Sequence, residues 1–171
     1  KQSIYVNGKL VKEHLGGFLP ITIDLTKEGV KAGSQCIIAV KADNSDDGTY
    51  PPGKKQTALD FCYHGGMYRD VWLIGKSPVA ITDAIEANEV AGGGVFVHYG
   101  NISEKSAQVL MNVEVENVSK SFANATITAR IKDHHGKVVN TVKGKLMLKD
   151  GVKSTAMLQA TMSKPHLWSP E

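Results

Sequence analysis

The chain has 171 residues, of which 42% are hydrophobic, and its formal net charge at neutral pH is +3. This length and apolar content are enough for one or two packed domains, which excludes wholesale disorder. Its lysines are scattered and no apolar run approaches the roughly 20 residues of a membrane-spanning helix, so we expect neither a nucleic-acid nor a membrane partner.

Several strand-like segments occupy residues 1–76, which we take as the first domain. Residues 3–14, "SIYVNGKLVKEH", have two alternating arms around Asn7-Gly8, which predicts a hairpin with a type I′ turn. Further strands are expected in "FLPITIDL", "QCIIAVKADN" and "MYRDVWLI". The long polar segment 44–60 is typical of a functional or disordered loop.

Strict alternation of apolar and polar residues marks the second domain, residues 77–171, after a boundary near Pro78. Three segments place one apolar set inward: Val109, Met111, Val113 and Val115; Ala125, Ile127, Ala129 and Ile131; Ala156, Leu158, Ala160 and Met162. Turn clusters separate these segments, which predicts an antiparallel, immunoglobulin-like β-sandwich within an all-β chain. It holds about six strand candidates where such a sandwich has about seven, so we expect its last strand to be missing.

Residues 60–74, "DFCYHGGMYRDVWLI", carry the strongest chemical pattern in the chain. Asp60, Tyr63 and His64 precede a double glycine, which permits unusual backbone angles or close approach. A carboxylate beside aromatic rings suits sugar recognition, because the carboxylate accepts hydrogen bonds from hydroxyls while the rings cover C–H faces. The alternative is structural: Asp60 caps a turn and Tyr63 packs against its neighbours.

The two cysteines and Arg69 favour structural interpretations. Cys36 lies in an apolar run and is most simply a small buried residue, although a disulfide with Cys62 stays open. Arg69 falls within the expected strand "MYRDVWLI", where an ion pair or a backbone anchor is a better interpretation than a catalytic role.

Two further motifs resemble metal ligands without meeting the requirements of a metal site. "DNSDDG", residues 43–48, looks like the start of a calcium loop, but Lys54 stands where such a loop needs a glutamate. An Asx-rich turn is the better interpretation, with another cation site as a weaker alternative. His134 and His135 fall at a predicted turn between strands, so no metal site is predicted.

Four segments together resemble one enzyme family: "VNGKLVKEHLGGFLPITIDLT", "AVKADNSD", "DFCYHGGMYRDVWLI" and the terminal "HLWSPE". In this order they are similar to the N-terminal region of glycoside hydrolase family 2, and most similar to its bacterial β-galactosidases. The resemblance implies a partial galactose-binding-like jelly roll over residues 1–76 and the immunoglobulin-like sandwich over residues 77–171. In the family a (β/α)₈ barrel follows and carries two catalytic glutamates.

The implied function is that of a non-catalytic N-terminal fragment of a retaining hydrolase that cleaves terminal β-linked sugars in carbohydrate metabolism. Retaining hydrolysis needs two carboxyl groups about 5 Å apart, and the resemblance assigns both to the barrel, so we predict no catalytic residue and no hydrolysis by this chain alone. The alternative is a stand-alone carbohydrate-binding or adhesion module built from the same sandwich folds.

The resemblance also assigns substrate-binding residues. Asp60 matches the family aspartate that reaches into the barrel's pocket and contacts the terminal sugar, in some members beside a cation. His64, Tyr63 and Asn44 are weaker candidates at the same pocket. The implied partners are a β-galactoside-like carbohydrate and the barrel of the same parent chain, with no cofactor in this segment. Exposed strand edges leave a homo-oligomer open, and the location stays open among periplasm, cell exterior and cytoplasm.

Overall fold

Strands form nearly all the regular structure of the computed structural model, which describes residues 1–171 except Phe61, Tyr63 and Glu171. The predicted all-β class is confirmed. The chain divides into two compact units, Lys1–Leu73 and Ile74–Glu171, where we expected a boundary after residue 76. Among the described residues, no helix is both long and apolar enough to cross a membrane.

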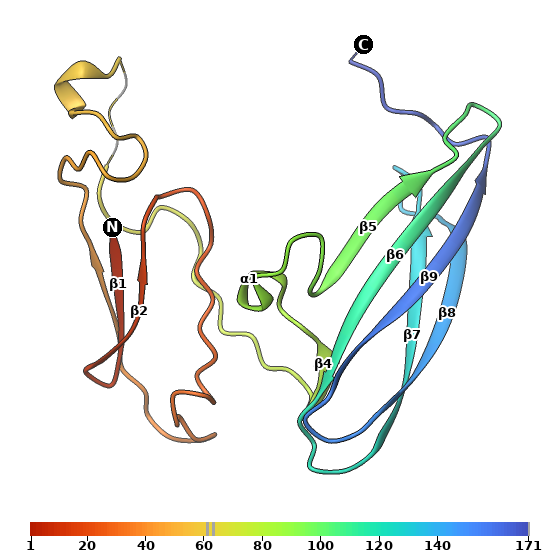
Figure 1. Cartoon of the computed structure of the whole chain (residues 1–171), viewed down its shortest axis with the longest axis horizontal. Helices are drawn as coiled ribbons and strands as arrows, with labels where there is room; N and C mark the ends of the chain where they lie inside the picture. Colours follow the sequence, from red (N-terminus) through yellow and green to blue (C-terminus); the bar gives the residue numbers. More distant parts are fainter. Residues whose placement is uncertain (61, 63, 171) are drawn as a thin grey trace. The chain divides into compact units, whose positions relative to one another are not determined.

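The first unit contains one three-stranded antiparallel sheet (Figure 1). Its order is β2-β1-β3, with β1 at Gln2–Val6, β2 at Lys9–His14 and β3 at Ile38–Ala42. The predicted hairpin is confirmed: Asn7 and Gly8 join β1 to β2 with φ of 50° and 83°, the positive values that a type I′ turn requires.

The turn of this hairpin is also tied to the chain just before β3. The Asn7 backbone N–H donates to the Ile37 carbonyl at 2.8 Å, and the Asn7 side-chain oxygen accepts from the Ile37 N–H at 2.9 Å. Ile4 and Val6 are the buried apolar residues of β1. The central strand is thus held on both edges, and it carries the small core of this unit.

Two strands predicted in this unit are absent. Residues 18–25 and 67–74 adopt no strand, and no ladder pairs either of them with another described segment. The apolar side chains of residues 67–74 are exposed, with Trp72 at 73% and Leu73 at 86%, whereas Ile21, Ile23 and Leu25 of the other segment are half-buried. Alternation marks a segment that can enter a sheet, but a strand forms only where a neighbouring backbone completes the hydrogen bonds.

The second unit contains most of the strands. Its elements are β4 (Val79–Ile81), α1 (Ala84–Ala87), β5 (Val95–Gly100), β6 (Ser106–Asn117), β7 (Ala123–Lys132), β8 (Val138–Leu148) and β9 (Lys153–Ser163). β6 pairs with β9 along one edge, and β5 and β4 share its other edge. β7 and β8 form a separate two-stranded sheet that lies behind β6 and β9 in Figure 1.

The inward faces predicted for β6, β7 and β9 are confirmed. The buried core consists of Val109, Met111, Val113, Val115, Leu148, Leu158 and Ala160. The inward residues of β7 pack against this core: Ala125, Ile127, Ala129 and Ile131. Two sheets therefore face each other across one apolar layer, which is the arrangement that period-two alternation favours.

β8 lies beside β9, so the strands follow one another around the core in the order β5, β6, β9, β8, β7. The Asn140 side-chain amide on β8 donates to the Thr161 carbonyl on β9 at 3.2 Å. Gly144 of β8 also approaches Leu158 of β9 so closely that an added Cβ would lie 2.6 Å from Leu158 Cδ2. In the described structure β5 and β7 are therefore the two ends of this series.

Two buried polar side chains hold the turns of this unit. Asn117 is fully buried, and its amide donates to the carbonyls of Ser121 (2.7 Å) and Leu148 (3.1 Å). Glu114 accepts a 2.7 Å hydrogen bond from the Thr82 hydroxyl, which itself accepts from the Gly94 N–H at 2.8 Å. Both side chains therefore form hydrogen bonds with backbone or hydroxyl groups, as buried polar groups generally do.

Candidate functional site

The predicted sugar-binding residues lie on exposed loops of the first unit. Asp60 follows the short 3₁₀ helix η1, Gln56–Ala58, and Asn44 follows β3. Asp60, His64 and Asn44 are all exposed, and Asp60 forms no hydrogen bond or ion pair with another residue that the structure describes. The turn cap proposed as the alternative for Asp60 is therefore absent from the described contacts. Tyr63 lies outside the described residues.

Glycine fits positions 65 and 66 for two different structural reasons. A Cβ on Gly65 would lie 3.1 Å from both Cγ and Oδ1 of Asn44, so a larger residue there would require the Asn44 amide to move by a few tenths of an ångström. Gly66 has a φ of +103°, which other residues rarely adopt. The structure thus brings Asn44 against the backbone that follows His64, and two of the predicted site residues belong to neighbouring loop segments.

The long loop between β3 and Asp60 is built from aspartate-centred turns. Asp43 accepts from the Ser45 hydroxyl and N–H, at 2.5 and 2.9 Å, and Asp47 accepts from those of Thr49, at 2.6 and 2.8 Å. These side-chain and backbone hydrogen bonds lower the pKa of both carboxyls. The predicted Asx-rich turn is confirmed.

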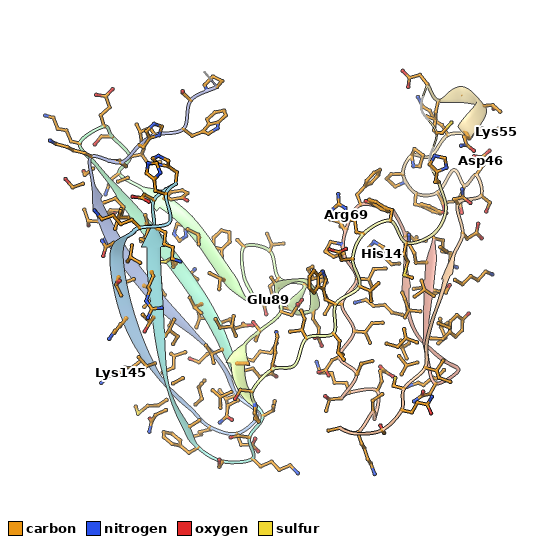
Figure 2. The ribbon with its side chains drawn as sticks, turned by 180° about the vertical axis from the view of Figure 1, so that it is seen from behind. His14, Asp46, Lys55, Arg69, Glu89 and Lys145 are labelled. Carbon is orange, nitrogen blue, oxygen red and sulfur yellow. The ribbon has the colours of Figure 1, made fainter. Side chains whose placement is uncertain are left out.

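Asp46 joins the beginning of this loop to its end. Its carboxylate accepts from the Gln56 N–H at 2.9 Å, beside Lys55, and Figure 2 shows Asp46 and Lys55 close to η1. In the part of the chain that the structure describes, no three His, Cys, Asp or Glu side chains come together in a group that could hold a metal ion. The acidic residues of this loop therefore act as hydrogen-bond acceptors for its own backbone.

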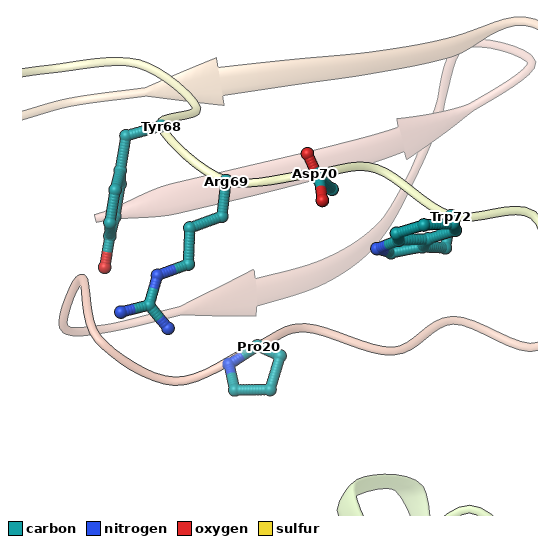
Figure 3. Close-up of a pocket in the computed structure, with 5 residues that line it drawn as sticks. All are labelled: Pro20, Tyr68, Arg69, Asp70 and Trp72. Carbon is teal, nitrogen blue, oxygen red and sulfur yellow. The ribbon is translucent and has the colours of Figure 1, made fainter.

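Sequence reasoning missed a shallow hollow in the first unit. It has a volume of about 470 Å³ and is lined by Pro20, Tyr68, Arg69, Asp70 and Trp72 (Figure 3). The Tyr68 hydroxyl donates to the Gly17 carbonyl at 3.1 Å, and the Arg69 guanidinium lies 5.2 Å from the centre of the Tyr68 ring. Alternation placed Arg69 and Tyr68 on opposite faces, but no strand forms here, so both line the same hollow.

The remaining candidate groups have structural positions. Cys36 is half-buried and Cys62 is exposed, and both are free thiols, so the disulfide alternative is wrong. His134 and His135 lie in the turn between β7 and β8, as predicted. There the Asp133 carboxylate accepts from the His135 N–H at 2.9 Å and organises the turn.

Comparison with known proteins gives a consistent result. The family model described as "Glycosyl hydrolases family 2" matches residues 94–171. A β-glucuronidase of Formosa agariphila is 31% identical over 96% of this chain and 17% of its own length. A β-galactosidase of Thermoanaerobacter pseudethanolicus is 28% identical over 98% of this chain and 20% of its own length.

Solved structures agree with the sequence relatives. Bacteroides uniformis β-glucuronidase 2, covalently bound to cyclophellitol-6-carboxylate aziridine, superposes with a TM-score of 0.81 and 29% identity over 99% of this chain and 19% of its own. The chain thus spans about a fifth of the length of the relatives it matches. The similarity includes both units, and the chain belongs to glycoside hydrolase family 2.

Proposed function

We propose that this chain is the non-catalytic N-terminal part of a longer retaining glycoside hydrolase that acts on terminal β-linked sugars. The observation that carries this proposal is that the similarity runs through almost the whole chain but covers only about a fifth of each relative. Those relatives are named β-glucuronidases and β-galactosidases. On this view the first unit is part of a sugar-binding jelly roll and the second is an immunoglobulin-like domain.

In this proposal the two carboxyl groups that break the glycosidic bond belong to the rest of the parent protein. Retaining hydrolysis requires an acid/base and a nucleophile about 5 Å apart. Three described carboxylates instead interact with neighbouring residues: hydrogen bonds lower the pKa of Asp43 and Asp47 within their turns, and Lys1, at 2.9 Å, lowers the pKa of Glu13. The role of this chain is then to support the barrel and complete its sugar pocket.

Asp60 is the residue that we propose to contact the sugar. Its carboxylate is exposed and has no partner among the described residues, so it can accept hydrogen bonds from sugar hydroxyls. Charged hydrogen bonds of this kind are the stronger class, and they contribute by positioning the glycoside rather than by breaking bonds. A carboxylate repels another carboxylate, so this contact suits the hydroxyls of a β-galactoside better than the acid group of a β-glucuronide.

His64 and Asn44 would form the edge of the same pocket. The Asn44 side chain is held against Gly65, the residue that follows His64, so a sugar bound at one would be near the other. Tyr63 is a further candidate from the sequence alone. The described residues contain no group of three His, Cys, Asp or Glu side chains that could hold a metal ion. A cation beside Asp60 in the parent protein would therefore need further ligands.

The hollow beside Trp72 supports an alternative function, that of a carbohydrate-binding module independent of any barrel. Exposed Tyr68 and Trp72 rings next to Asp70 are the residue types that bind sugars. The two proposals therefore assign the sugar contact to different aspartates, Asp60 and Asp70, which makes them separable by substitution.

The test compares Asp60→Ala with the matched control Asp70→Ala in the full-length protein. Loss of a hydrogen bond to a charged group costs about 1.5–3 kcal/mol, so Asp60→Ala should lower kcat/KM for a nitrophenyl β-galactoside by roughly 10- to 150-fold. Asp70→Ala should leave it unchanged. A nitrophenyl β-glucuronide measured in parallel identifies the sugar, and residues 1–171 alone should hydrolyse neither compound.

Circular dichroism and thermal melting of both variants establish that they are folded. Wild-type kinetics in a folded Asp60→Ala protein would remove Asp60 from the pocket. If residues 1–171 alone bind galactose, and Asp70→Ala abolishes that binding, the carbohydrate-binding module replaces the hydrolase fragment as the better account.

A further inference from the structure

The outer face of β7 and β8 carries cations and no acidic side chain. Neither strand contains an aspartate or glutamate, and their charged residues are Arg130, Lys132, Lys143 and Lys145, which we call the basic row. These residues alternate with the inward residues of the two strands, and all four are exposed. Figure 2 shows Lys145 on the outer side of its sheet. The outer face of this sheet is therefore positively charged.

Pairing of β7 with β8 brings these cations, which are spread over 16 residues of sequence, into one line. They occupy successive outward positions of the ladder, and a threonine lies opposite three of them: Lys145–Thr126, Lys143–Thr128 and Arg130–Thr141. Lys132 is the next outward residue after Arg130 along β7. Successive outward positions on a strand are roughly 7 Å apart, so the basic row is about 20 Å long. Hydroxyl groups accompany it for most of that length.

No described side chain neutralises the basic row. The ion pairs of the described structure involve other residues, and neither the row nor the hydroxyls of Thr126, Thr128 and Thr141 form a side-chain hydrogen bond with a described residue. Asp133 and Asp150 lie in the flanking turns, where each accepts hydrogen bonds from backbone N–H groups. The cations and the hydroxyls are thus available to a partner of opposite charge.

We propose that the basic row binds a polysaccharide whose sugars carry carboxylate groups. A carboxylate has two acceptor oxygens, so it can bind a cation on one strand and the threonine hydroxyl opposite, on side chains whose Cβ atoms lie about 5 Å apart. The remaining sugar hydroxyls find further partners in the same threonines. A single exposed ion pair contributes little to binding, so the row favours a polymer that contacts several cations at once over one acidic sugar.

Other polyanions fit this face less well. Proteins that bind single-stranded nucleic acid stack its bases on aromatic side chains, and neither β7 nor β8 contains an aromatic residue. An acidic peptide would pair with the cations but would offer the threonines no row of hydroxyls. The inference goes beyond the proposed function, because the basic row lies on the second unit, Asp60 belongs to the first, and binding at the row requires no hydrolysis.

Calorimetric titration with polygalacturonate tests the proposal in the full-length gene product and in residues 1–171. Both proteins should bind it at low salt, and neither should bind uncharged dextran. Raising the ionic strength from about 0.01 to about 0.15 M should weaken binding, because the screening length falls from about 30 to about 8 Å. Absence of binding by the full-length protein at low salt would overturn the proposal, whether the row is then a solvated face or is covered by the rest of the parent.

A matched pair of double substitutions locates the binding. Lys143→Gln with Lys145→Gln should raise the dissociation constant for polygalacturonate roughly three- to thirtyfold, since two exposed ion pairs are lost. Lys31→Gln with Lys54→Gln removes the same net charge from exposed positions of the first unit and should leave binding unchanged. Equal weakening by the two pairs would mean that net charge alone is responsible, and it would remove the site from β7 and β8.

Competition identifies the chemical class of the partner. Polyglutamate and single-stranded DNA, at matched concentrations of charge, should bind more weakly than polygalacturonate. Thr128→Val removes one exposed hydroxyl and should weaken the binding of polygalacturonate but not that of polyglutamate. Tighter binding of polyglutamate or DNA would overturn the assignment to a polysaccharide. Wild-type kinetics in Asp60→Ala would leave all these measurements unchanged, so this proposal and the proposed function fail separately.

Discussion

At the scale of single residues, Asp43 and Asp47 make the turns of the loop between β3 and Asp60 sensitive to low pH. Hydrogen bonds from Ser45 and Thr49 lower both pKa values below the ordinary 3.8. A carboxyl whose pKa is lower in the folded state stabilises that state fully above its unfolded pKa, and the contribution is lost as pH falls through the folded value. The turns should therefore loosen only below about pH 4, and the loop should be unaffected near neutral pH.

The first residue-scale prediction concerns Thr49→Val. This change removes the 2.6 Å hydroxyl bond to Asp47 but keeps the 2.8 Å bond from the backbone N–H. The pKa of Asp47 should therefore rise part of the way toward 3.8, which NMR titration of its carboxyl carbon measures. Ser45→Ala is the control and should act on Asp43 alone. An unchanged Asp47 pKa in Thr49→Val would show that the hydroxyl bond does not form in solution.

At the scale of elements, alternation predicted strands well only where a partner strand exists. β6, β7 and β9 have long ladders, and their inward faces are those that the sequence indicated. Residues 67–74, an apolar and aromatic segment that was also predicted to be a strand, have no ladder among the described residues. Periodicity is a property of one segment, whereas hydrogen-bond completion requires a second segment. The same distinction explains why Tyr68 and Arg69 line one hollow.

Strand packing gives an element-scale prediction at Gly144. Because an added Cβ would lie 2.6 Å from Leu158 Cδ2, Gly144→Ala should overpack the β8–β9 contact and lower the free energy of unfolding by about 1–3 kcal/mol. Combining it with Leu158→Val should recover part of this loss, since the two sites share one contact. Urea denaturation measures both effects.

Gly100→Ala is the matched control on another strand. Its added Cβ would meet nothing nearer than Gln108 Oε1 at 3.4 Å, the end of a polar side chain that can shift. Strictly additive losses in the Gly144→Ala, Leu158→Val double variant would mean that overpacking is not the cause.

At the scale of the whole molecule, the two units differ in how much core they contain. The first unit has three short strands, and its buried apolar residues among those described are Ile4 and Val6. The second has strands of up to 12 residues around a continuous core. Large apolar side chains such as Trp72 and Leu73 stay exposed in the first unit, so burial stabilises it less.

This difference predicts two unfolding transitions for residues 1–171. Backbone amides of β1 should lose protection at a lower urea concentration than those of β6, because stability follows buried apolar area. Hydrogen exchange monitored through a urea series measures the two midpoints. Gly144→Ala provides the control, since it should move the β6 midpoint and leave that of β1 in place. A single shared midpoint would contradict independent stabilities.

Local sequence was sufficient to predict the Asn7-Gly8 hairpin, the Asx turns of the long loop and the inward faces of β6, β7 and β9. Turn chemistry and alternation depend on neighbours along the chain, so they can be recognised without the tertiary structure. The resemblance of four segments in order, "DFCYHGGMYRDVWLI" among them, identified the family, but the sugar-contact role of Asp60 stays a prediction. Tertiary structure alone revealed the approach of Asn44 to Gly65, the hollow beside Trp72 and the close approach of Gly144 to Leu158. Each of these depends on which distant segments lie side by side, and a residue's burial is set by those neighbours rather than by its own sequence position.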